Sequence, residues 1–526
     1  MIRNPILPGF NPDPSIVRVG DDYYIATSTF EWFPGVQIHH SRDLVNWELI
    51  ARPLDRPSQL DMIGNPDSGG IWAPCLSYAD GLFWLIYTDV KQWTGTRHKI
   101  TYNYLVTAPA ITGPWSEPTF LDASGFDASL FHDDDGRKWY LSMIWDHRVE
   151  RNQFTGTLLQ EFDPKTRTLI GPRHNICKGT DLKFTEGPHL YRRDGWYYLL
   201  LAEGGTWYTH AATMARSRTI EGPYEIDPEN PFLTAAGHED ATLQKAGHAS
   251  IVQTKSGAWY VVHLVGRRLR DKRCILGRET AIQHFEWNAD GWPRLSHGGP
   301  CPAVEVVDDG LPLTSPTPAS RSHREEFDST ELNIHFQALR RPITSDWLDL
   351  TARPGWLRLY GAEPPTSNFR QALIARRVQA FAFEATTCLD FAPEDFKHMA
   401  GLIAYYDTTN HYYLRISQDE QLGRHVGIIK CDAGQNGEMQ ATETALPDAG
   451  PVHLKVTMQR EAMQFAYSLD GATWTPVGPE LDATILSDDY HKLGFTGAFV
   501  GLSAQDLTGR NHPADFDYFE YRELDA

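Results

Sequence analysis

The sequence predicts an all-β protein in which a five-bladed β-propeller is followed by a β-sandwich. A unit that ends in a turn and two adjacent aromatic residues occurs in five copies, about sixty residues apart, between residues 10 and 265. The aromatic pairs are Tyr23-Tyr24, Phe83-Trp84, Trp139-Tyr140, Tyr197-Tyr198 and Trp259-Tyr260. Aromatic and β-branched runs follow the turns, and long helical stripes are missing, so strands are expected. A unit of short strands cannot bury both faces without neighbours, which predicts blades around a common axis.

The chain is long enough for two domains, because 526 residues exceed one ordinary core. A stretch rich in Pro, Ser and Thr over residues 308–323 is typical of a linker. We therefore expect the propeller in residues 1–307 and the second domain in residues 324–526. The second domain contains alternating segments and an Asp470-Gly471 turn between two strand-like runs, which predicts a β-sandwich.

Three of the repeated units carry an acidic residue about ten to twelve residues before the aromatic pair. This spacing places Asp13, Asp127 and Glu186 at the same point of the repeat, which would bring them together if they lie on the innermost strands. A single acid is more often a turn residue, but the turns lie separately, at pairs such as Asp194-Gly195. Converging carboxyls without a cluster of metal ligands suit acetal cleavage, in which one group protonates the leaving oxygen and another activates water.

Composition excludes several classes of partner. The formal net charge of -20 argues against nucleic acid, which requires clustered Lys and Arg. No apolar run has the length of a membrane span, and the first residues enter the first repeat without a signal-peptide core, so a cytoplasmic protein without a membrane partner is expected. The many aromatic side chains are suitable platforms for sugar rings. The six cysteines are scattered and are interpreted as buried thiols.

Several segments, in the same order along the chain, resemble glycoside hydrolase family 43 β-xylosidases of the two-domain type. They are Asn11–Ser15, Thr27–Gly35, Ile71–Pro74, Phe126–Ser129, Thr185–His189 and Gly277–Thr280. The resemblance extends over essentially the whole chain and implies a five-bladed propeller followed by a concanavalin-like sandwich. It also implies an exo-acting, inverting enzyme that releases xylose from the non-reducing end of β-1,4-xylooligosaccharides, and a homo-oligomer, either a dimer or a tetramer.

The same resemblance assigns roles to the three acids. Asp13 would be the general base that activates water, and Glu186 would be the general acid. Asp127 would orient Glu186 and raise its pKa, because a neighbouring anion disfavours ionisation. An inverting enzyme needs its two working carboxyls about 6.5 to 9.5 Å apart, and different blades can provide that separation.

The resemblance also implies a set of substrate-binding residues. Phe30, Trp72 and Arg278 would shape the first subsite, although the two aromatic residues alone would be interpreted as core. The remaining members of the predicted set are Trp145, Thr206 and Phe499. Phe499 lies in the segment Gly494–Gly501 and would reach the pocket rim from the second domain; the alternative is an ordinary sandwich-core residue.

His248 occupies, in the fifth unit, the region that carries an acid in three others. Some family members use a histidine here to bind a divalent cation on the propeller axis, so Ca²⁺ or Mg²⁺ near His248 is one interpretation. A lone histidine is otherwise a hydrogen-bonded structural residue. No cofactor is expected to be required for the reaction itself.

Other functions remain open at this stage. An α-L-arabinofuranosidase, or one enzyme with both activities, is the nearest alternative because the two sugars expose similar hydroxyls. A fructan-cleaving retaining enzyme has the order Asn-Asp-Pro-Asn in its first blade, whereas this chain has Asn11-Pro12-Asp13-Pro14. In a non-catalytic carbohydrate-binding propeller all three acids would be incidental, which their repeated placement argues against.

Overall fold

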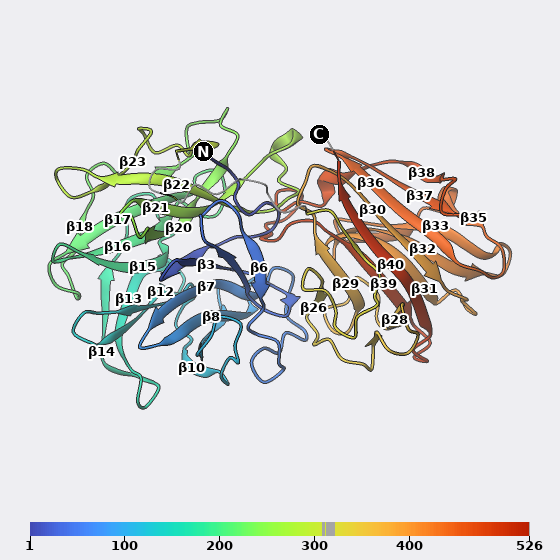
Figure 1. Ribbon diagram of the computed structural model, residues 1–526, viewed down its shortest axis with the longest axis horizontal. Coiled ribbons are helices and arrows are strands. Elements are labelled where there is room, and N and C mark those ends of the chain that lie inside the picture. The colour runs from blue at the N-terminus through green and yellow to red at the C-terminus, as the bar shows by residue number, and fades with distance from the viewer. Residues whose placement is uncertain (308–310, 312–320, 525–526) are drawn as a thin grey trace.

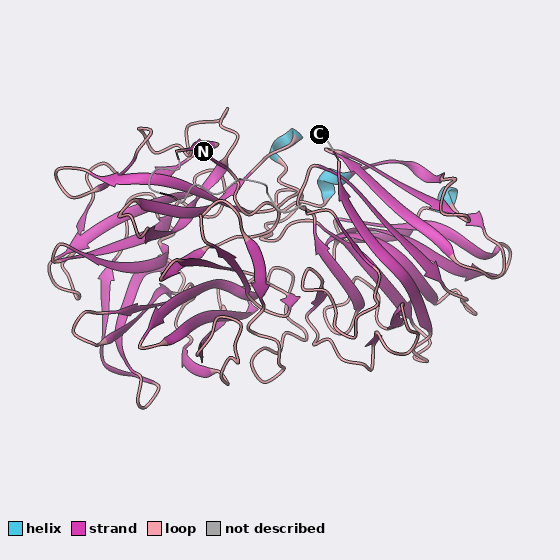
Figure 2. Cartoon of the chain, in the orientation of Figure 1, coloured by secondary structure: helices cyan, strands magenta, loops and turns pink. Residues whose placement is uncertain are grey.

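The computed structural model describes residues 1–307, 311 and 321–524, which form two all-β domains lying side by side (Figure 1). Strands dominate both domains, as Figure 2 shows. The helical turns within the described residues are η1 (Arg270–Lys272), η2 (Gln440–Thr442) and η3 (Ala483–Ile485). No helix in this part of the chain is long and apolar enough to cross a membrane.

The N-terminal domain is the predicted five-bladed propeller, and the described residues form one antiparallel sheet for each blade. The first blade comprises β2 (Ser15–Val19), β3 (Asp22–Thr27), β5 (Gln37–Ser41) and β6 (Glu48–Ala51). The second comprises β7 (Gly70–Ala79), β8 (Leu82–Gln92), β9 (Ile100–Ala108) and β10 (Thr119–Asp122). The third comprises β11 (Ser129–His132), β12 (Lys138–Trp145), β13 (Phe154–Asp163) and β14 (Thr168–Cys177).

The last two blades complete the ring. The fourth comprises β15 (Glu186–Arg193), β16 (Trp196–Glu203), β17 (Ala211–Ser217), β18 (Glu225–Ile226) and β19 (Leu233–Thr234). The fifth comprises β20 (Gln244–Gln253), β21 (Trp259–Gly266), β22 (Glu279–Trp287) and β23 (Pro293–Leu295). A short pair, β1 (Ile2–Arg3) with β24 (Glu305–Val306), joins the two ends of the domain.

The repeated aromatic pairs lie on the second strand of each blade, where they help to fill the spaces between blades. In one such space, Leu200 of β16 belongs to the same buried apolar cluster as Ile251 of β20 and Val261 of β21. Each blade therefore buries its faces against its neighbours, as the repeat predicts. The first strands, β2, β7, β11, β15 and β20, contact one another around the axis.

The C-terminal domain is a sandwich of two antiparallel sheets. One has the order β27 (Leu348–Asp349), β28 (Leu357–Tyr360), β40 (Pro513–Glu523), β30 (Ala382–Asp390), β36 (Val452–Gln459), β37 (Ala462–Ser468) and β38 (Thr475–Asp482), with β25 (His323–Glu325) also on β40. The other has the order β34 (Gln435–Glu438), β33 (Gly423–Asp432), β32 (Asn410–Asp419), β31 (His398–Asp407), β39 (Phe499–Asp506), β29 (Ala372–Arg377), β26 (Gln337–Leu339) and β4 (Trp32–Phe33), with β35 (Thr444–Ala445) on β33. Fully buried side chains such as Leu402, Phe465 and Phe516 form its core.

The two domains share a sheet, because β4 belongs to the propeller segment of the chain and pairs with β26 of the sandwich. Arg340, just after β26, strengthens this junction. Its backbone N–H donates to the carbonyl of Glu31 at 2.8 Å, and its guanidinium lies 2.8 Å from the carboxylate of Asp67. The predicted linker, residues 308–323, lies largely outside the described residues, and its last residue, His323, already begins β25.

Candidate active site

A repeated backbone feature places functional side chains at the propeller axis. Near the start of each innermost strand, one residue has a positive φ, between 23° and 56°. These residues are Asp13, Ala73, Asp127, Gly187 and His248. A non-glycine residue with positive φ is uncommon, and such residues gather at functional sites. The pairing register also shifts at this point in β7, β15 and β20, which is typical of bulges that redirect side chains.

This alignment corrects one detail of the sequence interpretation. Asp13 and Asp127 occupy the repeated position, but in the fourth blade Gly187 occupies it and Glu186 lies one residue earlier. The three acids therefore do not share one point of the repeat. They nevertheless line the same pocket.

The pocket has a volume of about 200 Å³. It brings together nine of the predicted site residues, namely Asp13, Asp127, Glu186, Phe30, Trp72, Trp145, Thr206, Arg278 and His248. Further lining residues that the sequence interpretation missed are Trp93, Lys99, Phe126, Phe154, Phe184, Gly205, Trp207, Leu493 and Phe495. The pocket thus combines a small set of ionisable groups with a largely aromatic wall.

Asp13 is held as a carboxylate. Nη1 of Arg278 donates to its Oδ1 at 2.8 Å, and Oγ of Ser28 donates to its Oδ2 at 2.7 Å. Burial opposes ionisation and is the largest influence, but the charges of Arg278 and His248 and the hydrogen bond from Ser28 together lower the pKa below its usual value. Asp13 is therefore ionised at neutral pH and available to accept a proton.

Glu186 and Asp127 are held in the opposite state. Burial, followed by the negative charge of Asp13, raises the pKa of Glu186 to about 8, although Arg278 and Lys99 oppose this shift. Burial, followed by the charges of Glu186 and Asp13, also raises the pKa of Asp127. The predicted effect of Asp127 on Glu186 is thus not the main one, because burial and Asp13 dominate. The pocket combines an ionised carboxylate with a protonated carboxyl, as general acid–base catalysis requires.

The rings of the aromatic wall pack against one another. The ring of Trp72 meets Phe126 edge to face with centroids 5.2 Å apart, and it meets Phe495 in the same way at 5.5 Å. Nε1 of Trp72 donates to the carbonyl of Ser68 at 2.8 Å, so its polar atom is satisfied away from the pocket. The wall therefore presents apolar faces on which a sugar ring can stack.

Lys99 is a pocket residue that no sequence pattern indicated, because it lies in a polar loop between β8 and β9. Its Nζ lies 4.5 Å from the ring centroid of Trp145 and 5.5 Å from that of Trp72. Burial lowers the pKa of Lys99 to about 8, while the charge of Glu186 opposes the shift. Lys99 therefore interacts electrostatically with Glu186 and favours the ionised form of that carboxyl.

The assignment of Phe499 to the pocket rim is wrong. Phe499 is the first residue of β39, is fully buried, and stacks on Trp32 with ring centroids 3.8 Å apart. Phe495, in the preceding loop, lines the pocket instead. The loop is fixed to the propeller, because the N–H of Phe495 donates to Oγ of Ser68 at 3.0 Å and Nη2 of Arg278 donates to its carbonyl at 3.2 Å.

His248 faces the carboxylates. Its Nδ1 lies 3.8 Å from Oδ1 of Asp13 and 4.0 Å from Oδ2 of Asp127. Burial, the largest influence, lowers the pKa of His248. In the part of the chain that the structure describes, no group of three or more His, Cys, Asp or Glu residues is arranged to hold a metal ion. A cation beside His248 would therefore need water for most of its ligands, and it stays a prediction.

Comparisons with known proteins agree with this architecture. Residues 2–293 match Glycosyl hydrolases family 43, and residues 324–522 match the Beta xylosidase C-terminal Concanavalin A-like domain. The chain is 54% identical over 533 residues to Xylosidase/arabinosidase 43B of Humicola insolens, covering 99% of this chain and 98% of that protein. It is 51% identical over 534 residues to Beta-xylosidase of Bacillus subtilis, with 99% of each covered.

A solved structure is also very similar over its full length. The crystal structure of xylan beta-1,4-xylosidase from Bacillus halodurans has a TM-score of 0.97 and 54% sequence identity, covering 99% of this chain and 100% of that one. The matching family covers more than half of this chain, and the relatives are similar from end to end. The chain therefore belongs to glycosyl hydrolase family 43 and is a glycoside hydrolase with a C-terminal concanavalin-like domain.

Proposed function

We propose that this protein is a β-xylosidase that releases single xylose units from the non-reducing end of β-1,4-xylooligosaccharides with inversion of configuration. The observation that carries this proposal is the opposite protonation of two carboxyls in one pocket. The pKa of Asp13 is lowered, whereas that of Glu186 is raised to about 8. The names of the Bacillus subtilis and Bacillus halodurans relatives support xylose as the sugar.

In the proposed reaction, Glu186 donates its proton to the glycosidic oxygen as the bond to the anomeric carbon breaks. Asp13 removes a proton from a water molecule that attacks the same carbon from the opposite face. The leaving chain departs with the proton from Glu186, and the released xylose carries the oxygen from water. Arg278 keeps Asp13 ionised through its 2.8 Å contact, and Asp127 is assigned to positioning Glu186.

The size of the pocket supports action at a chain end. Its volume of about 200 Å³ is below the range of roughly 300 to 1,000 Å³ typical of sites for drug-sized ligands. Leu493 and Phe495 of the sandwich line it together with residues of the propeller. Xylotriose should therefore yield xylose and xylobiose first, detected by chromatography. A rapid fall in the viscosity of soluble xylan, which signals internal cutting, would contradict exo action.

The stereochemistry is tested separately. Proton NMR of the first product should show α-xylose before mutarotation, because water attacks directly and no covalent intermediate forms. The variant Asp13→Ala should lose at least about 10²-fold in rate with the fold retained. Observation of β-xylose as the first product would overturn the role assigned to Asp13.

A second activity, hydrolysis of α-L-arabinofuranosides, is supported by one specific comparison, since the Humicola insolens relative is named a xylosidase/arabinosidase. The aromatic wall does not by itself distinguish a pyranose from a furanose ring. Rates on the two 4-nitrophenyl glycosides, measured under the same conditions, decide between a xylosidase and a bifunctional enzyme. A faster rate on the arabinofuranoside would make that activity the principal one.

Two further properties are proposed without a structural test. We propose a weakly held Ca²⁺ or Mg²⁺ beside His248; chelation should then lower the melting temperature and added cation should restore it, because a bound cation stabilises the folded state. If exhaustive chelation leaves the melting temperature unchanged, the proposal of a bound cation is wrong.

We also propose a cytoplasmic homodimer or homotetramer. Fractionation of cells tests the location, and light scattering tests the oligomeric state.

A further inference from the structure

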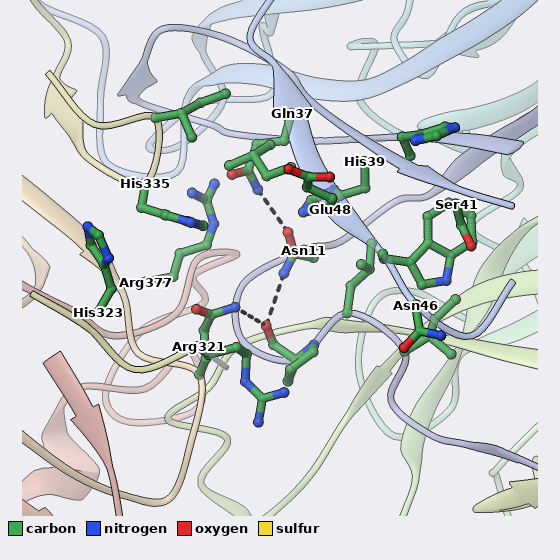
Figure 3. Close-up of a pocket in the computed structure, with 18 of the residues that line it drawn as sticks. Asn11, Gln37, His39, Ser41, Asn46, Glu48, Arg321, His323, His335 and Arg377 are labelled. Carbon is green, nitrogen blue, oxygen red and sulfur yellow. Dashed lines mark hydrogen bonds between the residues drawn. The ribbon is translucent and has the colours of Figure 1, made fainter. Parts of the chain in front are cut away.

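A second and larger cavity lies between the first blade and the sandwich. It has a volume of about 780 Å³ and shares no lining residue with the catalytic pocket. The propeller contributes residues 6–8, Asn11, Arg52, and β5 with the start of β6 and the loop between them. The sandwich domain contributes residues 321–323 and 333–335, together with Arg376, Arg377 and Gln379. Figure 3 shows Arg377 and His335 approaching the hollow from the sandwich side and His39 approaching it from the blade. Both domains therefore supply its walls.

Three arginines in this cavity have buried N–H groups that find no acceptor among the described residues. These groups are Nη1 and Nη2 of Arg52, Nε of Arg376 and Nη2 of Arg377. Arg376 is only 3% exposed and Arg377 only 5%. A buried donor without a partner is costly, so its presence in three neighbouring guanidinium groups requires an explanation.

The partners that these arginines do have are neutral. Nε of Arg52 donates to the carbonyl of Ile334 at 2.9 Å, and Nε of Arg377 donates to the carbonyl of Phe10 at 2.6 Å. Nη2 of Arg376 donates at 3.1 Å to the carbonyl of Arg321 and at 3.1 Å to Oε1 of Gln379. Within the described residues, none of the three forms an ion pair with a carboxylate, although buried charges are normally paired.

The positive charges repel one another. Burial lowers the pKa of Arg52 to about 9, and burial followed by the charge of Arg52 lowers the pKa of Arg377. Burial, then Arg376 and Arg52, lowers the pKa of His335 to about 3. Buried His39 adds an Nδ1 atom that has no hydrogen-bond partner in the part of the chain that the structure describes. Burial is the largest cause of all three shifts, and neighbouring positive charges add to it for Arg377 and His335.

The acids that line the cavity do not neutralise these arginines. Asp43 accepts hydrogen bonds from neighbours in the chain, namely the backbone N–H groups of Val45 and Asn46 and Oγ of Ser41. Glu48 is exposed and forms no ion pair among the described residues. Arg321, another lining residue, already pairs with Glu523 at 2.7 Å. The unpaired positive charge of Arg52, Arg376 and Arg377 is therefore available to a ligand.

We propose that this cavity binds a phosphate-type oxyanion, either inorganic phosphate or a small phosphate ester. The planar guanidinium group donates two parallel hydrogen bonds that match the oxygens of such an anion. The volume of about 780 Å³ leaves room for an organic group attached to the phosphate. Because Arg52 belongs to the propeller and Arg376 and Arg377 to β29 of the sandwich, the anion links the two domains.

The test starts from the full-length protein in phosphate-free buffer. Inorganic phosphate and ribose 5-phosphate are titrated in parallel, with sodium chloride at the same ionic strength as a control, and binding is followed by calorimetry and melting temperature. Near saturation, the bound anion should raise the melting temperature by about 2 to 4 °C, because it stabilises only the folded state. Tighter binding of ribose 5-phosphate would identify an ester as the ligand, whereas equal affinity would identify the phosphate group alone.

The variant Arg52→Gln should lose this response and keep the rate on 4-nitrophenyl β-xyloside, because Arg52 does not line the catalytic pocket. The matched control is Arg137→Gln in a turn of the third blade, where the exposed arginine pairs with Asp135 at 2.8 Å. This control should respond to phosphate like the native protein. An equal shift with chloride, an unchanged response of Arg52→Gln, or no shift with either phosphate compound would overturn the proposal.

A second measurement does not depend on any variant. Crystals of the native protein grown without phosphate are soaked with tungstate, a tetrahedral oxyanion with a strong anomalous signal. The anomalous peak should lie within hydrogen-bonding distance of Arg52, Arg376 or Arg377. Tungstate bound only elsewhere, or not at all, would contradict the proposed site even if a substitution of Arg52 prevented folding.

Discussion

The raised pKa of Glu186 predicts a specific form of pH dependence. The general acid works only while protonated, so activity on a poor leaving group is lost as pH rises through the pKa of Glu186, which is about 8. About nine-tenths of Glu186 is protonated at pH 7 and about one-tenth at pH 9. kcat/KM on xylobiose should therefore fall about tenfold between these two values. Asp13 works while ionised, so its lowered pKa places the acid limb well below neutral pH.

Replacing Glu186 should lower the rate by an amount that depends on the leaving group of the substrate. Glu186→Gln should lower kcat/KM on xylobiose by about 10² to 10⁴-fold, or roughly 2.7 to 5.4 kcal/mol in activation free energy. The loss should be far smaller on 2,4-dinitrophenyl β-xyloside, because that leaving group departs without a proton. Asp13→Asn should impair both substrates, since water must be activated in each case.

The assay is a series of aryl xylosides of increasing leaving-group pKa, measured from pH 5 to pH 10 for the native protein and both variants. The slope against leaving-group pKa should be steep for Glu186→Gln and shallow for the native enzyme. Equal losses for the two variants across the series would refute the assignment of acid and base. An alkaline limb that persists unchanged in Glu186→Gln would show that another group produces it.

Four other substitutions test the pocket and the domain junction. Lys99→Met should move the alkaline limb to higher pH, because it removes a positive charge that lowers the pKa of Glu186. Phe495→Ala should lower kcat/KM about tenfold with little change in stability, whereas Phe499→Ala should destabilise the protein by about 3 to 5 kcal/mol in urea unfolding. Lys245→Met should cost about 3 to 5 kcal/mol, because it leaves its carboxylate partners in the sandwich without a counter-charge.

The two lysine substitutions have matched lysine controls, and the two phenylalanine variants are compared with each other. Lys255→Met removes an exposed pair with Asp21 and should change stability by less than about 1 kcal/mol. Lys91→Met, which lies near the pocket loop but outside the lining residues, should leave the alkaline limb where it is. A downward shift of the limb in Lys99→Met, or equal stability of Phe495→Ala and Phe499→Ala, would contradict the structural assignment.

The repeat in the sequence is sufficient to predict the propeller, because each blade repeats the same hairpin chemistry. Turns such as Asp194-Gly195 and the aromatic pairs that follow them are local signals, and they fall where the blades require them. The strands of the sandwich are harder to locate from the sequence, because its alternating segments do not recur at a fixed period. The contribution of β4 to the sandwich is not predictable from local pattern, because Trp32–Phe33 is a two-residue strand that pairs with residues three hundred positions away.

Some residues of the active site are predictable from the sequence, and others are not. The carboxyls and Arg278 belong to short segments that resemble the family, so the sequence identifies them. The sequence does not predict that Phe495 lines the pocket and Phe499 lies in the core, because both are phenylalanines in one Gly-rich segment. Only the start of β39 determines which of them faces the core. Lys99 belongs to a polar loop without a recognisable pattern, and its proximity to Glu186 is created only by folding.

Arg278 shows why the sandwich is part of the catalytic unit. One guanidinium nitrogen holds Asp13 at 2.8 Å, and another donates at 3.2 Å to the carbonyl of Phe495 in the sandwich. The same arginine therefore stabilises the charge of the base and fixes the loop that closes the pocket. Lys245 of the fifth blade reinforces this arrangement through its 2.8 Å contact with the carboxylate of Asp489, whose pKa is lowered. Because a charge loses much of its stabilisation when its partner is displaced, movement of the sandwich loop would alter the protonation of Asp13 as well as the shape of the pocket.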